Sequence, residues 1–385
     1  MNNRLPLFYA VTVILWSSLY FYMPYVTPFA EQMEADVRLI GIIAGSYGFW
    51  QMTLRFPLGI YADLLQKRKI FIVLGMFFSG LAGLIVYVFP NPISLLAGRS
   101  FAGVAATVWV AFTILAASYY RREESVKAVG HMNAAFSIGR IVSLLIGGFI
   151  AEGLGFNYAF LVAAVVGFTG FALSFAIVER PPEGTKKDPP KLSELLAVTK
   201  NRQLLCAATL ATFSQYIFFA TTFGFTPLIA YQMGASNIQL SWLGIVATVP
   251  GLLVSPNVSA VAKRFGVSLT LAVGFVLTGL GSVLIAYSSS LELLFVLQFM
   301  GSIGNFTVFT LVMGLSIRDI SAEHRATAMG FHQAVYGLGI FLGPAVMGWL
   351  VYGVGMGSSF VITGGLGLLA AVLSVIFVNR GYLRY

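Results

Sequence analysis

The sequence predicts an all-α polytopic membrane protein, and three observations support that fold class. Of its 385 residues, 58% are hydrophobic and 10% are charged, with a mean hydropathy of +0.86. Soluble domains carry about 25% charged residues, so this chain could not cover a soluble surface. Its apolar residues form long continuous runs instead of the alternating segments of a β-barrel. At roughly 20 residues per crossing, the length allows about twelve transmembrane helices.

Composition also argues against several other classes of protein. So few charged residues are not typical of a soluble enzyme, a disordered scaffold or a nucleic-acid-binding protein. The formal net charge of +9 does not indicate a nucleic-acid partner, because the basic residues gather in predicted loops on one membrane face. Cys206 is the single cysteine and the three histidines are widely spaced. We therefore expect no internal disulfide, no metal site and no cofactor.

Apolar runs bounded by charged residues predict the spans in order. Six precede a long polar stretch: residues 7–29, 40–61, 70–89, 93–118, 127–151 and 157–178. Six follow it: 204–231, 237–261, 267–287, 292–315, 325–352 and 357–378. The charged positions that separate most of these runs lie at 31–38, 67–69, 121–124, 152, 179–203, 263–264, 292, 318–325 and 380. Each run is long enough to cross the hydrocarbon core as a helix.

The polar stretch divides the chain into two parts. Residues 179–203 hold two proline pairs and a mixture of basic and acidic side chains, which is typical of a solvated linker. Within this stretch, residues 191–199 could form a short amphipathic surface helix. We therefore expect an N-terminal six-helix bundle over residues 1–178, a cytoplasmic linker over 179–203, and a C-terminal six-helix bundle over 204–385.

The distribution of lysine and arginine predicts the orientation. With the N-terminus inside, most basic residues lie in cytoplasmic loops, and the outer loops carry only Arg38. Three further arginines, Arg55, Arg99 and Arg140, fall within spans. We therefore expect both termini in the cytoplasm and a multi-pass protein of a bacterial-type inner (plasma) membrane.

The two halves repeat each other at an offset of 200 residues. Glycines in the fifth and eleventh spans correspond at this offset, and their flanking residues are similar: Gly130, Gly139 and Gly148 match Gly330, Gly339 and Gly348. Small residues in membrane helices also serve packing, but three coincident pairs at the same place in each half indicate duplication. Duplicated halves are typical of secondary transporters.

Three local patterns carry a more specific signature. Residues 59–69 read GIYADLLQKRK, with Gly59 and Asp63 ahead of the basic residues Lys67 and Arg68. The fourth span opens LAGRSFAG around Arg99, and the eleventh carries spaced glycines with a Gly-Pro pair at 343–344. Together these patterns resemble the major facilitator superfamily, and the resemblance covers nearly the whole chain.

The chain departs from the family pattern at a few positions. Leu64 stands where the loop motif has arginine, and Gln66 stands where it has glycine. In the fifth span, Ser143-Leu144 replaces the Gly-Pro pair that drug and metabolite exporters carry there. The resemblance to the twelve-helix exporter-like branch is therefore partial.

The resemblance implies a fold of two pseudo-symmetric six-helix bundles and transport by alternating access. It implies that Asp63 faces the N-terminus of the eleventh span, where the helix dipole stabilises a negative charge and the contact closes the cytoplasmic side. Close helix approach at glycines and a kink at proline suit a rocking interface. The expected gating residues are Gly59, Asp63, Lys67, Arg68, Gly139, Gly339, Gly343 and Pro344.

Arg140 is the principal candidate for solute binding. All 14 acidic residues fall in predicted loops or at span ends, whereas Arg140 lies about 13 residues into its span, roughly 20 Å from its start. A charge at that depth normally faces a cavity or a partner. Either the missing counter-charge is an anionic solute, or Arg140 is structural and bound to carbonyls and hydroxyls. Asn133, Ser137 and Arg140 recur at helical spacing, which favours a cavity-lining face.

Other polar side chains at helical spacing extend the candidate site. Arg99 matches a family motif with a general role, and Glu31 could reach it, whereas Arg55 could extend to the cytoplasmic face. In the family, helices 1, 4, 7 and 10 line the central path, although a buried amide is often only interhelical glue. The further expected contacts are Tyr22, Tyr25, Gln215, Gln298, Asn305, Gln333 and Tyr336.

Coupling and direction follow less directly from the residues. Proton-driven exporters of cationic drugs usually need a membrane-embedded acid, and none is predicted. His131 and His332 could carry a proton, or each could make a neutral interhelical hydrogen bond. Coupling could also be exchange against a counter-anion, or the protein could be a uniporter.

Together these features predict a secondary active transporter of a small organic solute, anionic or amphipathic, with a lean toward export. The alternatives are a multidrug efflux pump and an organic-anion uptake or exchange transporter. No nucleophile cluster or nucleotide-binding loop indicates an enzyme, and no large soluble domain indicates a sensor. The expected partners are the solute, the lipid bilayer and a coupling proton or counter-anion. We expect a monomer and no nucleic-acid partner.

Overall fold

The computed structural model of the chain describes residues 5–65, 67–119, 125–179, 199–320 and 325–383. Within these ranges the regular elements are all helical. Most of the surface helix expected over residues 191–199 lies outside the described residues, as does most of the linker.

The N-terminal half supplies eight of the labelled α-helices and one short 3-10 turn. In chain order they are α1 (Leu5–Tyr20), η1 (Met23–Tyr25), α2 (Val26–Gln32), α3 (Val37–Leu65), α4 (Lys69–Val88), α5 (Pro92–Thr107), α6 (Trp109–Ser118), α7 (Ser125–Leu154) and α8 (Phe156–Ser174). Asn91 caps α5 by accepting hydrogen bonds from the backbone of Ile93 and Ser94, at 3.0 and 2.9 Å.

The C-terminal half repeats this order. Its elements are α10 (Arg202–Ala220), η3 (Thr221–Phe225), α11 (Thr226–Gln232), α12 (Asn237–Val254), α13 (Val258–Phe265), α14 (Val267–Ile285), α15 (Leu291–Ser316), α16 (Arg325–Val354) and α17 (Met356–Asn379). Ser236 caps α12, and its hydroxyl accepts from the Gln239 backbone at 3.2 Å.

These elements confirm the predicted membrane fold. Eleven helical segments of the described chain are long and apolar enough to cross a bilayer. The 29-residue helix α3 fills the place of the remaining predicted span. Large apolar side chains such as Ile93, Phe149 and Val296 are more than 60% exposed, which a lipid environment would cover. The fold is therefore an all-α bundle of twelve spans.

Several spans expected to be continuous are broken, which corrects the predicted boundaries. The first span is interrupted by η1, and the seventh by the π-turn η3, both ahead of a Thr-Pro pair. The fourth span divides between α5 and α6, and the eighth divides at residues 255–257 between α12 and α13. Such breaks expose backbone groups in the middle of a span, so they need side-chain partners there.

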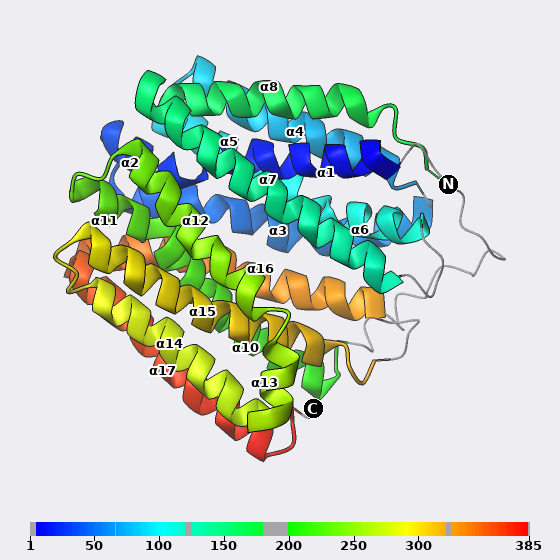
Figure 1. Cartoon of the computed structure of the whole chain (residues 1–385), viewed down its shortest axis with the longest axis vertical. Coiled ribbons are helices and arrows are strands. Elements are labelled where there is room, and N and C mark those ends of the chain that lie inside the picture. Colours follow the sequence, from blue (N-terminus) through cyan, green and yellow to red (C-terminus); the bar gives the residue numbers. More distant parts are fainter. Residues whose placement is uncertain (1–4, 66, 120–124, 180–198, 321–324, 384–385) are drawn as a thin grey trace.

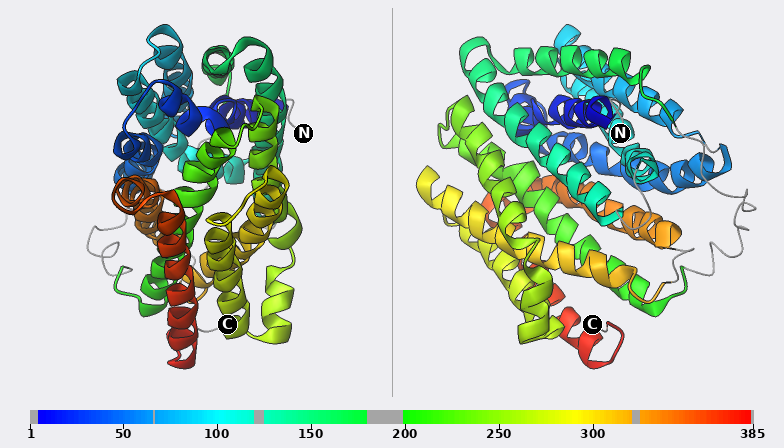
Figure 2. Two further views of the ribbon diagram at one scale, coloured as in Figure 1. Left: turned by 90° about the vertical axis from the view of Figure 1, so that its left-hand side faces the viewer. Right: turned by 45° about the vertical axis from the view of Figure 1, so that its right-hand side comes forward.

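The bundle has two sides, which we name from the chain. The terminal side holds both ends of the described chain and the turn at residues 67–68, whereas the distal side holds the turns near residues 34, 155, 234 and 355. The helices of the N-terminal and C-terminal halves approach each other on the distal side and diverge toward the terminal side (Figure 1). Helices α3 and α16 pack side by side between the halves, as do α7 and α12 (Figures 1 and 2).

Contacts between the halves occur in equivalent pairs whose positions differ by 200 residues. A Cβ built on Gly148 in α7 would lie 3.0 Å from the Cβ of Ser241 in α12. The equivalent contact joins α16 to α3, where a Cβ built on Gly348 would lie 3.1 Å from the Cα of Gly41. The two interfaces are thus related by the pseudo-symmetry predicted from the glycines.

Two of the predicted gating glycines pack within their own halves. A Cβ on Gly139 would lie 2.6 Å from the Val13 carbonyl oxygen in α1. Its counterpart Gly339 meets the Thr212 carbonyl oxygen in α10 even more closely. Only glycine allows the backbones to approach this far, so these residues fix α7 on α1 and α16 on α10.

Candidate functional site

Arg140 lies at the centre of the interface between the halves. Its side chain is 5% exposed, and its guanidinium donates a 2.9 Å hydrogen bond to the Thr248 hydroxyl of α12. The guanidinium carbon lies 4.5 Å from the ring centroid of Tyr20 and 5.0 Å from that of Phe136. A third ring, Phe223 of η3, lies at 5.8 Å. The faces of these rings stabilise the cation electrostatically.

The charge of Arg140 has no acidic partner among the described residues. The single ion pair found there joins Arg38 to Asp36 on the distal side. The Nε of Arg140 is buried and makes no hydrogen bond to the described part of the chain. A buried guanidinium with an unused donor can accept an anion, because the desolvation cost of the cation is already met by the rings and the Thr248 hydroxyl.

Four aromatic side chains form a continuous group beside Arg140, which we call the central rings: Tyr20, Tyr47, Phe219 and Phe223. Tyr20 and Tyr47 come from the N-terminal half, and the two phenylalanines come from the C-terminal half. Tyr47 and Phe219 lie 6.3 Å apart between centroids, Phe219 and Phe223 5.5 Å, and Phe223 and Tyr20 6.3 Å. Phe219 lies one turn from Gln215, in the helical stripe of the seventh span that the sequence predicts to line the cavity. The sequence analysis did not propose Tyr20, Tyr47 or Phe223, although aromatic residues gather at the breaks of the first and seventh spans.

Arg99 lies on the N-terminal side of the central rings. It is 2% exposed, and its guanidinium carbon lies 4.7 Å from the Tyr47 ring centroid. One of its nitrogens donates to the sulfur of Met23 in η1 at 3.4 Å, and Tyr22 lies within electrostatic reach. Glu31 does not reach it, because that carboxylate accepts a hydrogen bond from Gln232 on the distal side. The structure thus brings together Arg99 and Tyr22, two of the residues proposed from the sequence.

Arg55 does not extend to the membrane face, which corrects the expectation for this residue. It is 6% exposed, and it donates a 2.8 Å hydrogen bond across the halves to the Tyr336 hydroxyl of α16. His332 lies one turn from Tyr336, with ring centroids 5.6 Å apart. Both nitrogens of His332 are buried without a hydrogen bond to the described residues, and so is Oε1 of Gln333. Arg55, Tyr336 and His332 therefore form a second polar group, and Gln333 follows His332 in the chain.

The remaining polar side chains of the C-terminal half line the break in the seventh span. Gln298 donates to the Thr222 carbonyl in η3 at 3.4 Å, which satisfies a backbone group freed by the π-turn. The carbonyl oxygen of Asn305 accepts from the Ser214 hydroxyl at 2.6 Å. Gln215 is 5% exposed in the same helix, α10. The first two therefore hold the broken span in place, as interhelical glue does.

Three predicted residues lie apart from this centre. Asn133 and His131 of α7 are exposed, and the His131 ring packs edge-on against Tyr9 at 5.8 Å. Ser137 is partly buried between them and Arg140. Tyr25 is fully buried at the distal contact, where its hydroxyl and that of Ser241 are 2.5 Å apart. Tyr25 thus joins the two halves instead of bordering the central rings.

The distal side carries a set of polar contacts between the halves, which we call the distal clasp. Gln232 donates to Glu31 at 2.6 Å, and the backbone of Asn237 donates to Glu152 at 2.8 Å. Arg38 lies 4.1 Å from the ring centroid of Tyr352 and holds the pKa of the Asp36 carboxyl below its usual value through a hydrogen bond. Sequence reasoning assigned none of the contacts between the halves, because each of those joins residues far apart in the chain.

The predicted gating loop on the terminal side is described only in part. The surroundings of Gly59 and the side chain of Asp63 are outside what the structure describes, although both positions belong to helix α3. Lys67 is exposed, and the backbone nitrogens of Arg68 and Lys69 donate to the Glu179 carboxylate at 2.5 and 3.2 Å. Glu179 therefore caps α4, an interaction that the sequence analysis did not anticipate.

The other two gating positions lie in α16. A Cβ on Gly343 would meet the Tyr216 carbonyl oxygen of α10. The carbonyl oxygen of Pro344 closely approaches Gly41 of α3. They therefore lie where α16 contacts both halves at once.

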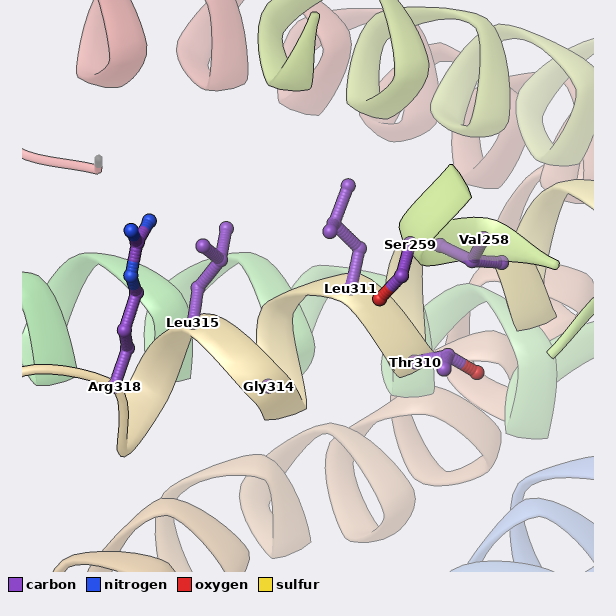
Figure 3. Close-up of a pocket in the computed structure, with 7 residues that line it drawn as sticks. All are labelled: Val258, Ser259, Thr310, Leu311, Gly314, Leu315 and Arg318. Atoms are coloured by element: carbon purple, nitrogen blue, oxygen red, sulfur yellow. The ribbon is translucent and has the colours of Figure 1, made fainter. Parts of the chain in front are cut away.

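A separate cleft opens on the terminal side of the C-terminal half, between α13 and α15 (Figure 3). Its volume is about 320 Å³, and Leu311, Leu315 and Arg318 of α15 line it together with Val258 and Ser259 of α13. At its edge the Thr310 hydroxyl donates to Ser255 at 3.0 Å, next to the break in the eighth span. None of the predicted site residues lines this cleft.

A duplicated twelve-span bundle with a buried cationic and aromatic centre defines the class of a membrane transporter. Comparison with known proteins agrees with this class. The family model of the Major Facilitator Superfamily matches residues 8–228 and 208–383. The chain belongs to this superfamily, as the loop, arginine and glycine-proline patterns predicted.

Individual relatives are distant. An uncharacterized MFS-type transporter of Methanocaldococcus jannaschii is 22% identical over 371 residues, covering 94% of each chain. The quinolone resistance protein NorA of Staphylococcus aureus is 25% identical over 154 residues, covering 40% of this chain and 39% of its own.

Solved structures share the fold at low identity. A bacterial homologue of the human lysosomal transporter Spinster, in an inward-facing and occupied conformation, superposes with a TM-score of 0.81 at 15% identity. It covers 99% of this chain and 98% of its own. The nucleoside transporter NupG superposes with a TM-score of 0.74 at 18% identity, covering 98% and 99%.

Proposed function

We propose that this protein is a secondary active transporter that moves a small organic anion across the membrane by alternating access. One observation carries the proposal: Arg140 is buried between the halves with a free donor, and no carboxylate pairs with it among the described residues. A solute that supplies the missing negative charge would bind both halves at once, through Arg140 and its neighbour Thr248. Such a position is required of a solute that controls which side opens.

The conformation supports alternating access around this site. The hydrogen bonds described between the halves lie from the distal clasp to the level of Arg140 and Arg55. The helices diverge beyond that level toward the terminal side (Figure 1). With the termini in the cytoplasm, as the basic loops predict, this arrangement is inward-facing. The two six-helix bundles joined by residues 179–203 would then be the rocking units, in a plasma membrane of bacterial type.

A second candidate function is multidrug efflux, favoured by the central rings and by the partial similarity to a quinolone resistance protein. Aromatic faces bind lipophilic cations, and they also stack on flat solutes. Against it, the central site holds three arginines and no acidic side chain among the described residues. The partial exporter motif favours export as the direction of transport. Export would be coupled either to exchange against an anion or to a proton carried by His332.

Thermal stabilisation of the purified protein tests the charge of the solute. Wild type and Arg140→Ala would be melted in detergent with benzoate, citrate and phosphate, with zwitterionic amino acids, and with tetraphenylphosphonium. A ligand that binds only the folded state raises the melting temperature, and the stabilisation grows with the logarithm of the ligand concentration relative to Kd. We expect one or more organic anions to stabilise wild type and to leave Arg140→Ala unaffected. The anion that stabilises wild type should cross proteoliposome membranes with wild type and not with Arg140→Ala.

A matched control is Arg264→Ala, which removes an exposed arginine of α13 that lies against Phe265. It should retain both the anion stabilisation and the flux of wild type. Stabilisation by tetraphenylphosphonium that persists in Arg140→Ala would instead make Arg140 structural and support multidrug efflux.

A further inference from the structure

The central rings are less completely buried than the most enclosed aromatic side chains of the protein. Phe112, Phe160, Phe225 and Phe275 are 0–1% exposed, as core rings should be. The central rings keep 7–9% exposure although they lie in the middle of their spans. Each of them therefore keeps a small accessible area, unlike the fully enclosed rings.

The geometry of one ring pair suits a flat guest. Tyr47 of α3 and Phe219 of α10 are nearly parallel, with 19° between their planes and 6.3 Å between centroids. They belong to opposite halves of the protein, so the distance between them changes when the halves move. A flat ring held between two parallel faces needs roughly twice the 3.5 Å contact distance of carbon atoms. A separation of the halves that brings the two faces to that distance would admit an aromatic ring between Tyr47 and Phe219.

Positive charge lies at both ends of the same group of rings. The Arg140 guanidinium lies 4.5 Å from Tyr20 and 5.8 Å from Phe223, and Arg99 lies 4.7 Å from Tyr47. Both arginines keep a buried Nε without a hydrogen bond to the described residues. An anionic group attached to a ring between Tyr47 and Phe219 would thus have a guanidinium donor nearby on either side.

From these observations we propose that the transported solute is an aromatic organic anion, whose ring is clasped between Tyr47 and Phe219 and whose anionic group is bound by Arg140. This inference rests on the proposed function and narrows its solute class. Aliphatic anions of the same charge would use Arg140 alone and would bind more weakly. Because the ring is held by one face from each half, its binding would also couple the two halves.

Isothermal titration calorimetry on the full-length protein in detergent tests the proposal with three probes. Phenylacetate and cyclohexylacetate carry the same carboxylate and differ in aromaticity, and phenethylamine carries the opposite charge. We expect phenylacetate to bind wild type about tenfold more tightly than cyclohexylacetate. In Phe219→Leu and Tyr47→Leu this ratio should fall to about one, while the affinity for cyclohexylacetate stays within about twofold of wild type. The control Phe77→Leu alters an exposed ring of α4 and should keep the tenfold ratio.

The outcomes separate the two proposals. Equal affinity of wild type for the two carboxylates, with both lost in Arg140→Gln, would overturn the aromatic solute and leave the anion site intact. Carboxylate affinities that Arg140→Gln does not change, or no binding of either carboxylate at about 10 mM, would overturn the anion site and the aromatic anion together. Tight binding of phenethylamine in that case would support the multidrug alternative.

Discussion

At the scale of single residues, this protein places three buried arginines within its spans without carboxylate partners among the described residues. Burial of a cation in a membrane interior is costly, and each guanidinium here meets that cost with ring faces and one hydrogen bond of its own. Arg140 and Arg55 each donate across the halves, to Thr248 and Tyr336. Arg99 donates within its own half, to Met23. The hydrogen bonds of Arg140 and Arg55 therefore depend on the relative position of the halves, whereas that of Arg99 does not.

The Arg55–Tyr336 hydrogen bond yields a prediction about stability. Tyr336→Phe keeps the ring that faces Arg55 and removes the hydroxyl that accepts from it at 2.8 Å. A buried charged donor that loses its acceptor should cost about 1–3 kcal/mol of stability. The apparent melting temperature in detergent measures this effect. Tyr287→Phe, which alters a side chain that is 72% exposed, is the control and should melt as wild type does. Equal melting of the two variants would show that Arg55 does not depend on the hydroxyl.

At the scale of elements, the broken spans and the glycines act together. The interruptions at η1 and η3 bring Tyr20, Met23 and Phe223 to the centre, where a straight helix would have continued its regular face. Glycines in α7 and α16 then hold those spans close to α1 and α10. The gating role of Gly339 and Gly343 stays a prediction, because their contacts hold α16 close to α10 within the C-terminal half.

A substitution in α16 tests this packing. Gly339→Ala would place a methyl group against the Thr212 carbonyl oxygen, and the backbones would have to separate. Overpacking of this kind typically costs about 1–3 kcal/mol, so we expect a lower melting temperature and reduced anion flux. Gly330→Ala is the matched control in the same helix, because a Cβ there meets nothing within 4 Å. It should be neutral or stabilising by up to about 1 kcal/mol. Loss of stability in both variants alike would argue against specific packing at Gly339.

At the scale of the whole molecule, the distal clasp and the pseudo-symmetric interfaces determine which side is closed. Glu31, Glu152 and Arg38 each contact the C-terminal half on the distal side. The α7–α12 and α3–α16 pairs repeat the same contact at an offset of 200 residues. A rocking motion about the level of Arg140 would therefore separate all of these contacts together.

A cross-link on the distal side tests whether this separation is required. The built Cβ of Gly148 lies 3.0 Å from the Cβ of Ser241, so a disulfide there needs the two helices to separate by roughly 0.5–1 Å. In a Cys206→Ser background, which removes the single native cysteine, Gly148→Cys combined with Ser241→Cys should join the halves on oxidation. Flux of the stabilising anion into proteoliposomes should then fall to background and return with dithiothreitol. Each single-cysteine variant is a control and should be insensitive to oxidation. Undiminished flux after complete cross-linking would refute distal opening.

The sequence by itself determined the class, the spans, the duplicated halves and the presence of membrane-embedded arginines. Each of these depends on composition, on the length of apolar runs or on short motifs, which are local properties of the chain. Only the tertiary structure decided the neighbours of those arginines. Arg140 is surrounded by Tyr20, Phe136, Phe223 and Thr248, which come from four separate elements. The structure also places Asn133 and Tyr25 away from the centre. The position of a residue in the helical repeat does not reveal which neighbouring helix it faces, or whether it faces lipid.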